Sequence, residues 1–395
     1  MSRYLNSAEA AARLGVSRQT LYAYVSRGLL RAAPGDRQRA SRYLEAEVEL
    51  LATQRARGRK PKEVAQATLN WGLPVLESAI TLIEDGQLFY RGENALDLAA
   101  SSSVEQVAAH LWQCDANRAF DARAPEAPEF LPALMASLRG QRAEQALLPL
   151  FTVASDDAAT ALWQQSSERC AQGSAALVRL LAACLLGSTP DSGALHEQCA
   201  RAWGVDAAGA DLIRMALVLF ADHELNASSF TARCIASTGA SLRAGVVGGL
   251  AALTGSRHGA TTSRVEALWD ELGADDVGVK LRARLERGDD LPGFGHHLYP
   301  RGDVRASALL ARVVPQHPAW RELVAQGALL VGQRPTLDFA LVAVRRHLDL
   351  PLGAAFGLFA LGRSIGWIAH GLEQRASQSL IRPRAAYTGI RAKSS

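Results

Sequence analysis

Residues 292–305 read PGFGHHLYPRGDVR, a stretch that differs sharply from the alanine- and leucine-rich sequence on either side. It holds three glycines, two histidines and two arginines. Glycines at this density let the backbone turn sharply and approach a ligand closely. Histidine and arginine are the side chains that polarise a carbonyl group and bind a carboxylate. The stretch therefore predicts a loop that holds a small, acidic, carbonyl-bearing molecule.

Three further polar segments interrupt the helical sequence of the chain. They read ADHELNASSFTAR (221–233), GSRHGATTSRV (255–265) and RPTLDFALVAV (334–344). Each contains a histidine or an aspartate beside a glycine or beside the start of an expected helix. A single histidine in a helical protein is usually a core or surface residue, but this repeated pattern favours a functional site.

Two of these segments contain candidate acid–base groups. Asp338 precedes an apolar run, and partial burial there raises the pKa of a carboxyl group toward that of a useful general base. The alternative is that Asp338 caps the helix that begins at Phe339, and the sequence alone favours neither interpretation. His258 precedes an expected helix over 261–272, where a histidine tends to stay neutral and can donate a hydrogen bond to an oxyanion.

The remaining groups complete a set that suits one class of reaction. His296, in the glycine-rich loop, is placed to polarise a second carbonyl. Three arginines are candidate carboxylate ligands, although each alone is typical of a surface residue: Arg305, Arg363 and Arg382. Such a set suits an enolate that forms on one substrate and attacks the carbonyl of an acidic second substrate. No metal is needed, because histidines supply the electrophilic help.

The motifs in this order resemble the citrate synthase family. The resemblance runs from about residue 75 to residue 390 and rests on ESAITLIEDGQLFYRG, SSSVEQVAAHLW, ADHELNAS, GSRHGA, GFGHHLYPRGDVRA, TLDFALV, GRSIGWIAHGLEQ and LIRPRAAYTG. It implies an all-α fold and a homodimer in which two domains close over the active site. We expect a large domain over 75–257 and 356–395, and a small domain over 258–355. The one β element expected in the body is a hairpin over 79–91 with its turn at Asp85-Gly86.

The resemblance also implies a role for each matching residue. Asp338 matches the base that takes a methyl proton from acetyl-CoA, and His258 matches the donor that stabilises the enol. His296 matches the group that polarises the oxaloacetate carbonyl, whereas the adjacent His297 is only a neighbour. Other matches bind oxaloacetate: His223, Arg305, Arg363 and, from the partner subunit, Arg382. Arg301 and Arg257 are expected to contact CoA, which is a substrate, and no cofactor is expected.

Three departures from the family pattern leave the substrate open. GSRHGA replaces the common GPLHGG, so that Arg257 places a charge beside His258. Asp303-Val304-Arg305 replaces Asp-Pro-Arg, and LDFALV replaces VDFYSG. The leading expectation is a citrate or 2-methylcitrate synthase. The alternative is a transcription regulator that senses a metabolite in the same pocket, and a purely structural protein is a third reading.

The first 62 residues differ in charge from the rest of the chain. They hold 13 Lys+Arg against 5 Asp+Glu, a net charge of +8, whereas the other 333 residues carry −4. Two short helices are expected over 8–14 and 18–27, capped by Ser7 and Ser17. Their apolar positions, at helix-turn-helix spacing, are Ala11, Leu14, Val16, Leu21 and Val25.

This N-terminal segment resembles the MerR/excisionase type of winged helix-turn-helix. The resemblance covers a domain over 1–57, which a basic linker over 58–74 follows. It implies that the second helix enters the major groove of double-stranded DNA and that two wing arginines contact the backbone. The residues concerned are Ser17, Arg18, Gln19, Thr20, Tyr22, Arg37 and Arg39. The alternative is a helical appendage whose basic face is only solvated.

Composition narrows the setting of the protein. The five cysteines are odd in number and widely spaced, which disfavours both a disulfide framework and a cysteine zinc site. No uninterrupted apolar run reaches the roughly 18 residues of a membrane helix, and the N-terminal sequence lacks the apolar core of a signal peptide. We therefore expect a cytoplasmic protein with no membrane partner.

Overall fold

The computed structural model describes residues 4–26, 30, 32–34, 41–45, 47–49, 51, 76–120, 124–273, 275–385 and 387–390. The chain divides into two compact units. One unit is the body, Ser78–Pro383, and the other holds Met1–Glu77 together with Arg384–Ser395. We describe each unit by itself.

The N-terminal unit contains two short helices and a small antiparallel sheet. The strand order is β1-β3-β2, so the first strand pairs with the last. Ala11, Leu14 and Leu21 are buried between the helices, as the apolar spacing predicted. The elements are β1 (Tyr4–Asn6), α1 (Ser7–Leu14), α2 (Arg18–Ser26), β2 (Ala33–Pro34) and β3 (Ser41–Leu44).

The caps of these helices differ in part from the prediction. Ser7 was expected to cap α1, but Asn6 does so: its side chain accepts from the backbone of Glu9, whose carboxylate accepts from the Asn6 N–H. Asn6 and Glu9 therefore form a reciprocal capping box. Ser7 cannot form one, because the residue three positions after it is an alanine, which has no side-chain acceptor. Ser17 does cap α2, because its Oγ accepts from the Thr20 N–H at 3.2 Å.

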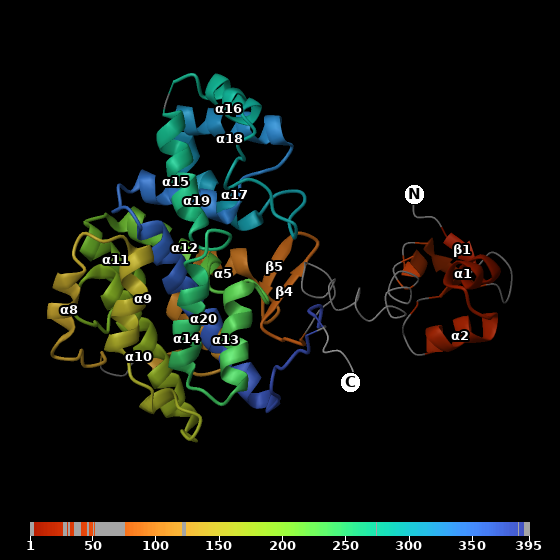
Figure 1. Ribbon diagram of the computed structural model, residues 1–395, viewed down its shortest axis with the longest axis horizontal. Coiled ribbons are helices and arrows are strands. Elements are labelled where there is room, and N and C mark those ends of the chain that lie inside the picture. Colours follow the sequence, from red (N-terminus) through yellow and green to blue (C-terminus); the bar gives the residue numbers. More distant parts are fainter. Residues whose placement is uncertain are drawn as a thin grey trace. The chain divides into compact units, whose positions relative to one another are not determined.

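The body is almost wholly helical, in agreement with the expected fold class. Figure 1 shows its helices packed around α20, which contacts α6, α9, α10, α12, α13, α14 and α19. The first elements are β4 (Thr81–Glu84), β5 (Gln87–Tyr90), β6 (Glu93–Asn94), α5 (Ala95–Ser101), α6 (Val104–Trp112), α7 (Ala116–Phe120), α8 (Leu131–Ser137), α9 (Ala143–Ala154), η1 (Ala158–Thr160), α10 (Ser167–Leu186), α11 (Leu195–Trp203) and α12 (Ala207–Leu219). The rest are α13 (Ala227–Ser237), α14 (Leu242–Leu253), α15 (Thr261–Leu272), α16 (Val277–Glu286), α17 (Val304–Val313), η2 (Val314–Gln316), α18 (Pro318–Val331), α19 (Leu337–His347) and α20 (Ala354–Ser377).

The predicted hairpin is present at the start of the body. Asp85 and Gly86 have φ values of 52° and 78°, as a two-residue turn of type I′ requires at both central positions. Strand β4 pairs with β5 from Thr81 opposite Tyr90 to Glu84 opposite Gln87.

Helix α20 forms the centre of the body because glycines let its neighbours approach. A Cβ on Gly362 would stand 2.8 Å from the carbonyl oxygen of Leu217, and one on Gly366 would stand 2.5 Å from that of Ala221. Between these glycines lies Arg363, which is therefore held deep in the protein.

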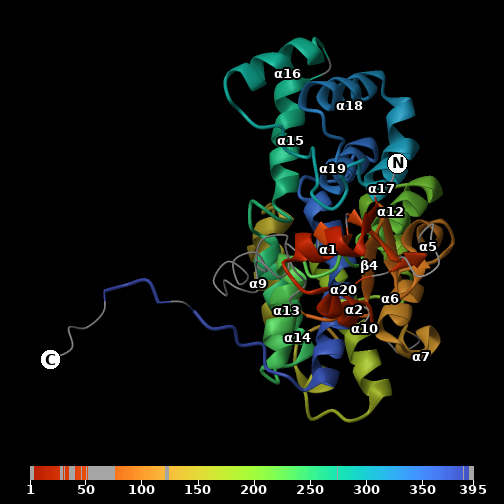
Figure 2. The same ribbon diagram turned by 90° about the vertical axis from the view of Figure 1, so that its right-hand side faces the viewer.

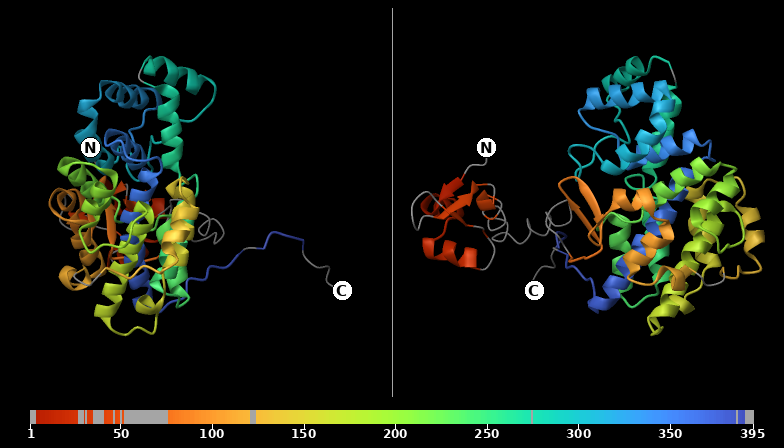
Figure 3. Two further views of the ribbon diagram at one scale, coloured as in Figure 1. Left: turned by 90° about the vertical axis from the view of Figure 1, so that its left-hand side faces the viewer. Right: turned by 180° about the vertical axis from the view of Figure 1, so that it is seen from behind.

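Helices α15 to α19 gather at one end of the body (Figures 1 and 2), and the view from behind in Figure 3 shows the same grouping. A buried ion pair joins two of them. Glu266 of α15 accepts from Nε and Nη2 of Arg345 of α19, both at 2.7 Å. These residues belong to the expected small domain, whose boundaries at 258 and 355 stay a prediction.

One described helix is long and apolar enough to cross a membrane. This helix, α10, has a mean hydropathy of 1.3 over an 18-residue window that is 67% buried inside the protein. The sequence analysis missed this window because two charged residues lie near its start and middle, Arg169 and Arg179. Its apolar surface packs against the core of the body.

Candidate active site

The carboxyl group of Asp338 lies at the N-terminal end of α19. Thr336 occupies the N-cap position of this helix, so the alternative in which Asp338 caps it is wrong. Oδ1 of Asp338 is buried and accepts no hydrogen bond from any described residue. Burial raises the pKa of this carboxyl group to about 6, against the opposing effect of Arg305. A carboxylate with these properties is suited to removing a proton near neutral pH.

His258 immediately precedes the first turn of α15, as predicted. Its Nε2 lies 2.8 Å from the hydroxyl of Ser228, near the start of α13. Burial, with a smaller effect of Arg363, lowers the pKa of His258 to about 4. The imidazole is therefore neutral at pH 7. A neutral imidazole can donate one hydrogen bond to a carbonyl oxygen that gains negative charge.

Glycines shape the loop that carries His296. Gly293 and Gly295 have φ near 83°, and the loop pairs with the segment before α19. The N–H of Gly295 donates to the carbonyl of Arg334, and the N–H of Thr336 donates to that of Gly293. The sequence prediction of a tight loop is thus confirmed, and the pairing fixes the loop beside the base of α19.

Three aromatic side chains meet at this loop. The rings of His223 and His296 are 5.2 Å apart, and Nε2 of His223 lies 3.1 Å from the hydroxyl of Tyr299. Burial, then Arg305, lowers the pKa of His296 to about 4, and burial together with the same arginine lowers that of His223 well below its ordinary value. Nδ1 of His296 accepts from the N–H of Leu298 at 3.2 Å, so the proton of the neutral ring lies on Nε2.

Arg305 is buried with its counter-charge. Its Nε and Nη2 donate to the two carboxylate oxygens of Asp303, at 3.0 and 2.8 Å. Burial alone lowers the pKa of Arg305, but Asp303 outweighs this effect and the net pKa is raised. The guanidinium also stands 5.3 Å from the centre of the Tyr299 ring. It is a permanent cation beside the histidine pair.

Arg363 supplies a second buried cation from the middle of α20. Its Nε donates to the carbonyl of Phe220 at 2.9 Å. Burial lowers the pKa of Arg363 to about 10, opposed by the Asp222 carboxylate, so the group remains charged at pH 7. Two buried guanidinium groups suit an anionic ligand, because a guanidinium donates paired hydrogen bonds to a carboxylate.

A buried carboxylate that the sequence analysis did not single out supports His223. Asp222 accepts from the Thr81 hydroxyl at 2.6 Å, and its carboxylate lies 3.2 Å from Nε2 of His370. Burial raises the pKa of Asp222, but His370 and Arg363 outweigh it and the pKa is lowered. The carboxylate is therefore ionised and ties three distant parts of the chain together: β4, α20 and the segment before α13.

The other candidate residues lie outside this buried group. Arg257, Arg301 and Arg382 are exposed, and Nη2 of Arg301 donates to the carbonyl of Asp85 in the β4–β5 turn. In the N-terminal unit, Ser17, Arg18, Gln19 and Tyr22 are exposed on one side of α2, with Thr20 partly buried. Arg37, Arg39 and the linker over 58–74 lie outside the described residues.

A metal centre is not evident in the part of the chain that the structure describes. No group of three or more histidine, cysteine, aspartate or glutamate side chains there could hold a metal ion. The sequence prediction that no metal takes part stays a prediction.

Solved structures of citrate synthases share the fold of the body. The body resembles citrate synthase from Thermotoga maritima with a TM-score of 0.69, at 24% identity over 82% of this chain and 96% of that chain. It resembles citrate synthase from Thermoplasma acidophilum, solved with carboxymethyl coenzyme A and oxaloacetate, with a TM-score of 0.68 at 22% identity over the same shares.

The sequence agrees. Residues 68–384 match the family described as citrate synthase, C-terminal domain, and residues 4–56 match a helix-turn-helix domain. The chain belongs to the citrate synthase family. It is 35% identical to citrate synthase 2 of Bacillus subtilis over 184 residues, 44% of this chain and 50% of the relative, so this match spans only half the relative's length. It is 29% identical to 2-methylcitrate synthase of Mycobacterium tuberculosis over 80% of this chain and 89% of that relative.

Proposed function

We propose that the chain condenses acetyl-CoA, or another short acyl-CoA, with oxaloacetate to give citrate or 2-methylcitrate and free CoA. The observation that carries the proposal is the carboxyl group of Asp338, whose Oδ1 is buried without a hydrogen-bond partner among the described residues and whose pKa is raised toward neutrality. It belongs to a body that also contains two neutral histidines and two buried arginines.

In the first step Asp338 takes a proton from the carbon next to the thioester carbonyl. His258 donates a hydrogen bond to the oxygen that gains negative charge. When the Ser228 hydroxyl donates to Nε2 of His258, the ring proton lies on Nδ1. The donor of the ring is then Nδ1–H, which does not face the serine. A neutral donor suits this role because its proton affinity is close to that of an enolate.

In the second step the enolate carbon attacks the ketone carbon of oxaloacetate. Nε2–H of His296 donates to the ketone oxygen and transfers its proton as the alcohol forms. Arg305 and Arg363 bind the carboxylates, and His223 contacts the same substrate. Water then hydrolyses the thioester, so that CoA leaves with the proton and the new acid retains the hydroxide.

Three of the residues that we propose to bind substrate lie at the surface. Arg257 and Arg301 are exposed cations that are suited to CoA phosphates, and Arg382 is an exposed cation after α20 that a homodimer would place at the partner's site. Domain closure of residues 258–355 over the rest of the body would exclude water from the enolate.

The direct test measures free thiol released by the full chain from oxaloacetate with acetyl-CoA or with propionyl-CoA. We expect release at least 100-fold above that of Asp338→Asn, as for loss of a general base. The ratio of the two rates separates a citrate synthase from a 2-methylcitrate synthase. Equal release by the wild type and Asp338→Asn would contradict the proposed role of Asp338.

A second function is favoured by the N-terminal unit. It matches a helix-turn-helix domain and exposes Arg18, Gln19 and Tyr22 on α2, as a recognition helix would. We propose that this unit binds double-stranded DNA, and that the body then serves as an enzyme, as a metabolite sensor, or as both. Binding should weaken steeply with salt, since bound arginines release counterions. The test is a selection of binding sequences from random DNA duplexes. If no sequence is enriched and the retention of DNA does not depend on salt, DNA binding is refuted and the unit is only a solvated appendage.

A further inference from the structure

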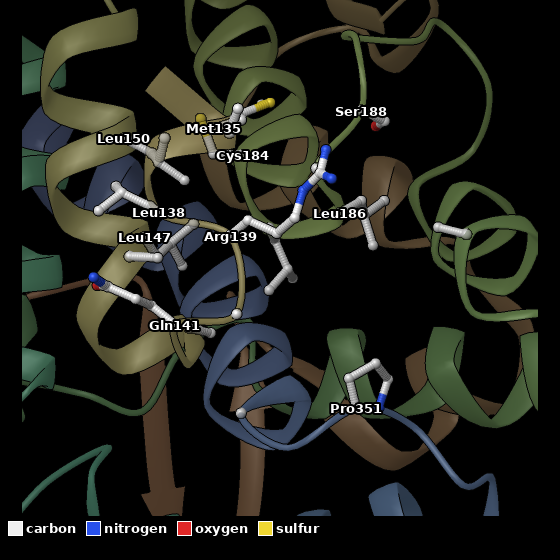
Figure 4. Close-up of a pocket in the computed structure, with 18 of the residues that line it drawn as sticks. Met135, Leu138, Arg139, Gln141, Leu147, Leu150, Cys184, Leu186, Ser188 and Pro351 are labelled. Carbon is white, nitrogen blue, oxygen red and sulfur yellow. The ribbon is translucent and has the colours of Figure 1, made fainter. Parts of the chain in front are cut away.

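A second cavity lies apart from the candidate active site. Its volume is about 630 Å³, within the range of roughly 300–1,000 Å³ that is usual for small-molecule pockets. None of the candidate catalytic or oxaloacetate-binding residues lines it. The wall is formed by α8, α9, the C-terminal ends of α10 and α11, and the segment Pro351–Ala354, as the close-up in Figure 4 shows in part.

Polar and apolar atoms contribute about equally to the wall of this cavity, and leucines and a methionine form its apolar part. Leu147 and Leu150 project from α9, Met135 from α8, and Leu186 from the end of α10 (Figure 4). Burying a chain of methylene groups against such side chains strengthens binding roughly fourfold for each CH₂. The apolar part of the wall therefore favours a ligand with an aliphatic chain.

One charged residue lines this cavity, and it is exposed to solvent. Arg139, just after α8, extends between the leucines of α9 and the end of α10 (Figure 4). Among the lining residues that the structure describes there is no aspartate or glutamate, and no described carboxylate forms an ion pair with Arg139. Gln141, Ser188 and Thr189 add neutral hydrogen-bonding groups. A guanidinium in this setting is complemented by an acidic head group.

The cavity also touches the connection between two elements of the candidate active site. Pro351–Ala354 joins α19, which carries Asp338, to α20, which carries Arg363. Gly353 has φ of 91° and packs so tightly on α9 that a Cβ there would lie 2.8 Å from the backbone nitrogen of Ala143. An occupant of the cavity thus contacts a segment that has little room to move on its other side.

We propose that this cavity binds an aliphatic carboxylate, with the chain along the leucines of α9 and α10 and the carboxylate on Arg139, and that its occupancy changes turnover at the active site. The effect on turnover rests on the proposed function, whereas the binding does not. The ligand class follows from a wall that holds one cation and no described carboxylate beside the leucines of α9 and α10.

The binding experiment uses the full chain and isothermal titration with octanoate, 1-octanol and acetate. Octanoate should bind measurably, and the alcohol and acetate should each bind at least about tenfold more weakly, since one lacks the charge and the other the chain. Arg139→Gln should weaken octanoate about tenfold or more. The matched control is Arg142→Gln, an exposed arginine outside the cavity, which should leave binding unchanged.

A second variant fills the cavity without removing the charge. Ala136 is an exposed lining residue, so Ala136→Phe should fold and should abolish octanoate binding. Octanoate that binds the wild type and Arg139→Gln equally would overturn the proposal. The proposal would also be overturned if the wild type binds no octanoate and Ala136→Phe changes the number of subunits measured by light scattering. The surface would then be a contact between copies of the chain.

Thiol release with and without octanoate separates the two proposals. Binding of octanoate to a protein that releases no CoA from either acyl-CoA would refute the proposed enzyme and leave the carboxylate site standing. Turnover that octanoate does not alter, in a protein that binds it, would overturn the coupling through Pro351–Ala354.

Discussion

Replacing Asp338 by asparagine should make the protein more stable and inactive at the same time. The pKa of this buried carboxyl group is about 6, against an ordinary value of 3.8. A pKa difference of about two units corresponds to about 3 kcal/mol at 1.36 kcal/mol per unit. Because the pKa is raised, the folded protein favours the protonated acid. Ionising this group therefore lowers the free energy of unfolding. The loss begins near pH 3.8 and reaches its full value above about pH 6.

Asparagine has nearly the same shape and carries no charge at any of these pH values. The difference in unfolding free energy between Asp338→Asn and the wild type should be small at pH 4, about 1.5 kcal/mol at pH 5 and about 3 kcal/mol at pH 8. For a body of this size, the last figure corresponds to a rise in Tm of about 5 °C. Thermal unfolding of both proteins at the three pH values, followed by circular dichroism, measures the trend.

The control is Asp349→Asn, an exposed aspartate just beyond the same helix, which should show no such pH dependence. If Asp338→Asn is no more stable than the wild type at pH 8, or if the difference does not grow between pH 4 and pH 8, the argument from burial is refuted. If Asp338→Asn loses turnover without becoming more stable, Asp338 keeps its proposed catalytic role, but burial no longer explains its raised pKa.

Three further outcomes follow from contacts in the body. Because burial holds the pKa of His258 near 4, kcat should show no histidine titration between pH 6 and 8, and a pKa near 6.5 assigned to it by NMR would contradict this. Because Arg345 and Arg346 both pair with the Glu266 carboxylate, replacing both arginines by alanine should destabilise the protein by about 3–5 kcal/mol in urea unfolding, whereas removing all three charges together should cost much less. Gly362→Ala should cost about 1–3 kcal/mol because its Cβ would meet a carbonyl at 2.8 Å, while Gly245→Ala, with 3.7 Å to its nearest neighbour, should be tolerated.

The sequence was most informative where a residue type is scarce. Histidines are uncommon in this chain, with 9 in 395 residues, so His258 and His296 stand out from the residues alone, and the close spacing of three glycines marks the loop of 292–305. The hairpin turn at Asp85-Gly86 is equally clear, because few residue pairs accept positive φ at both positions. In these places local chemistry and the fold require the same residues.

The parts that the sequence did not reveal depend on contacts between distant segments. Ser228, Asp222 and Tyr299 are ordinary residue types in their local sequence, and only the fold brings Ser228 to His258, Tyr299 to His223 and Asp222 to His370. Their proximity to a candidate histidine was the available signal for two of them, since Asp222 directly precedes His223 and Tyr299 follows His296 by one turn of the loop. Ser228 could have been found only from the packing of α13 against the segment before α15.

The hydrogen bond between Thr81 and Asp222 has a mechanical consequence. A tension applied to the chain from the N-terminal side enters the body at β4, whose first residue is Thr81. The Thr81 hydroxyl donates at 2.6 Å to the carboxylate of Asp222, next to His223, so part of the load reaches the candidate active site through this side-chain contact. The N–H of Ala79, two residues earlier, donates to Glu373 of α20 and shares the load with the long central helix. In a pulling experiment, the resistance of the first body segment would therefore report directly on the integrity of the site itself.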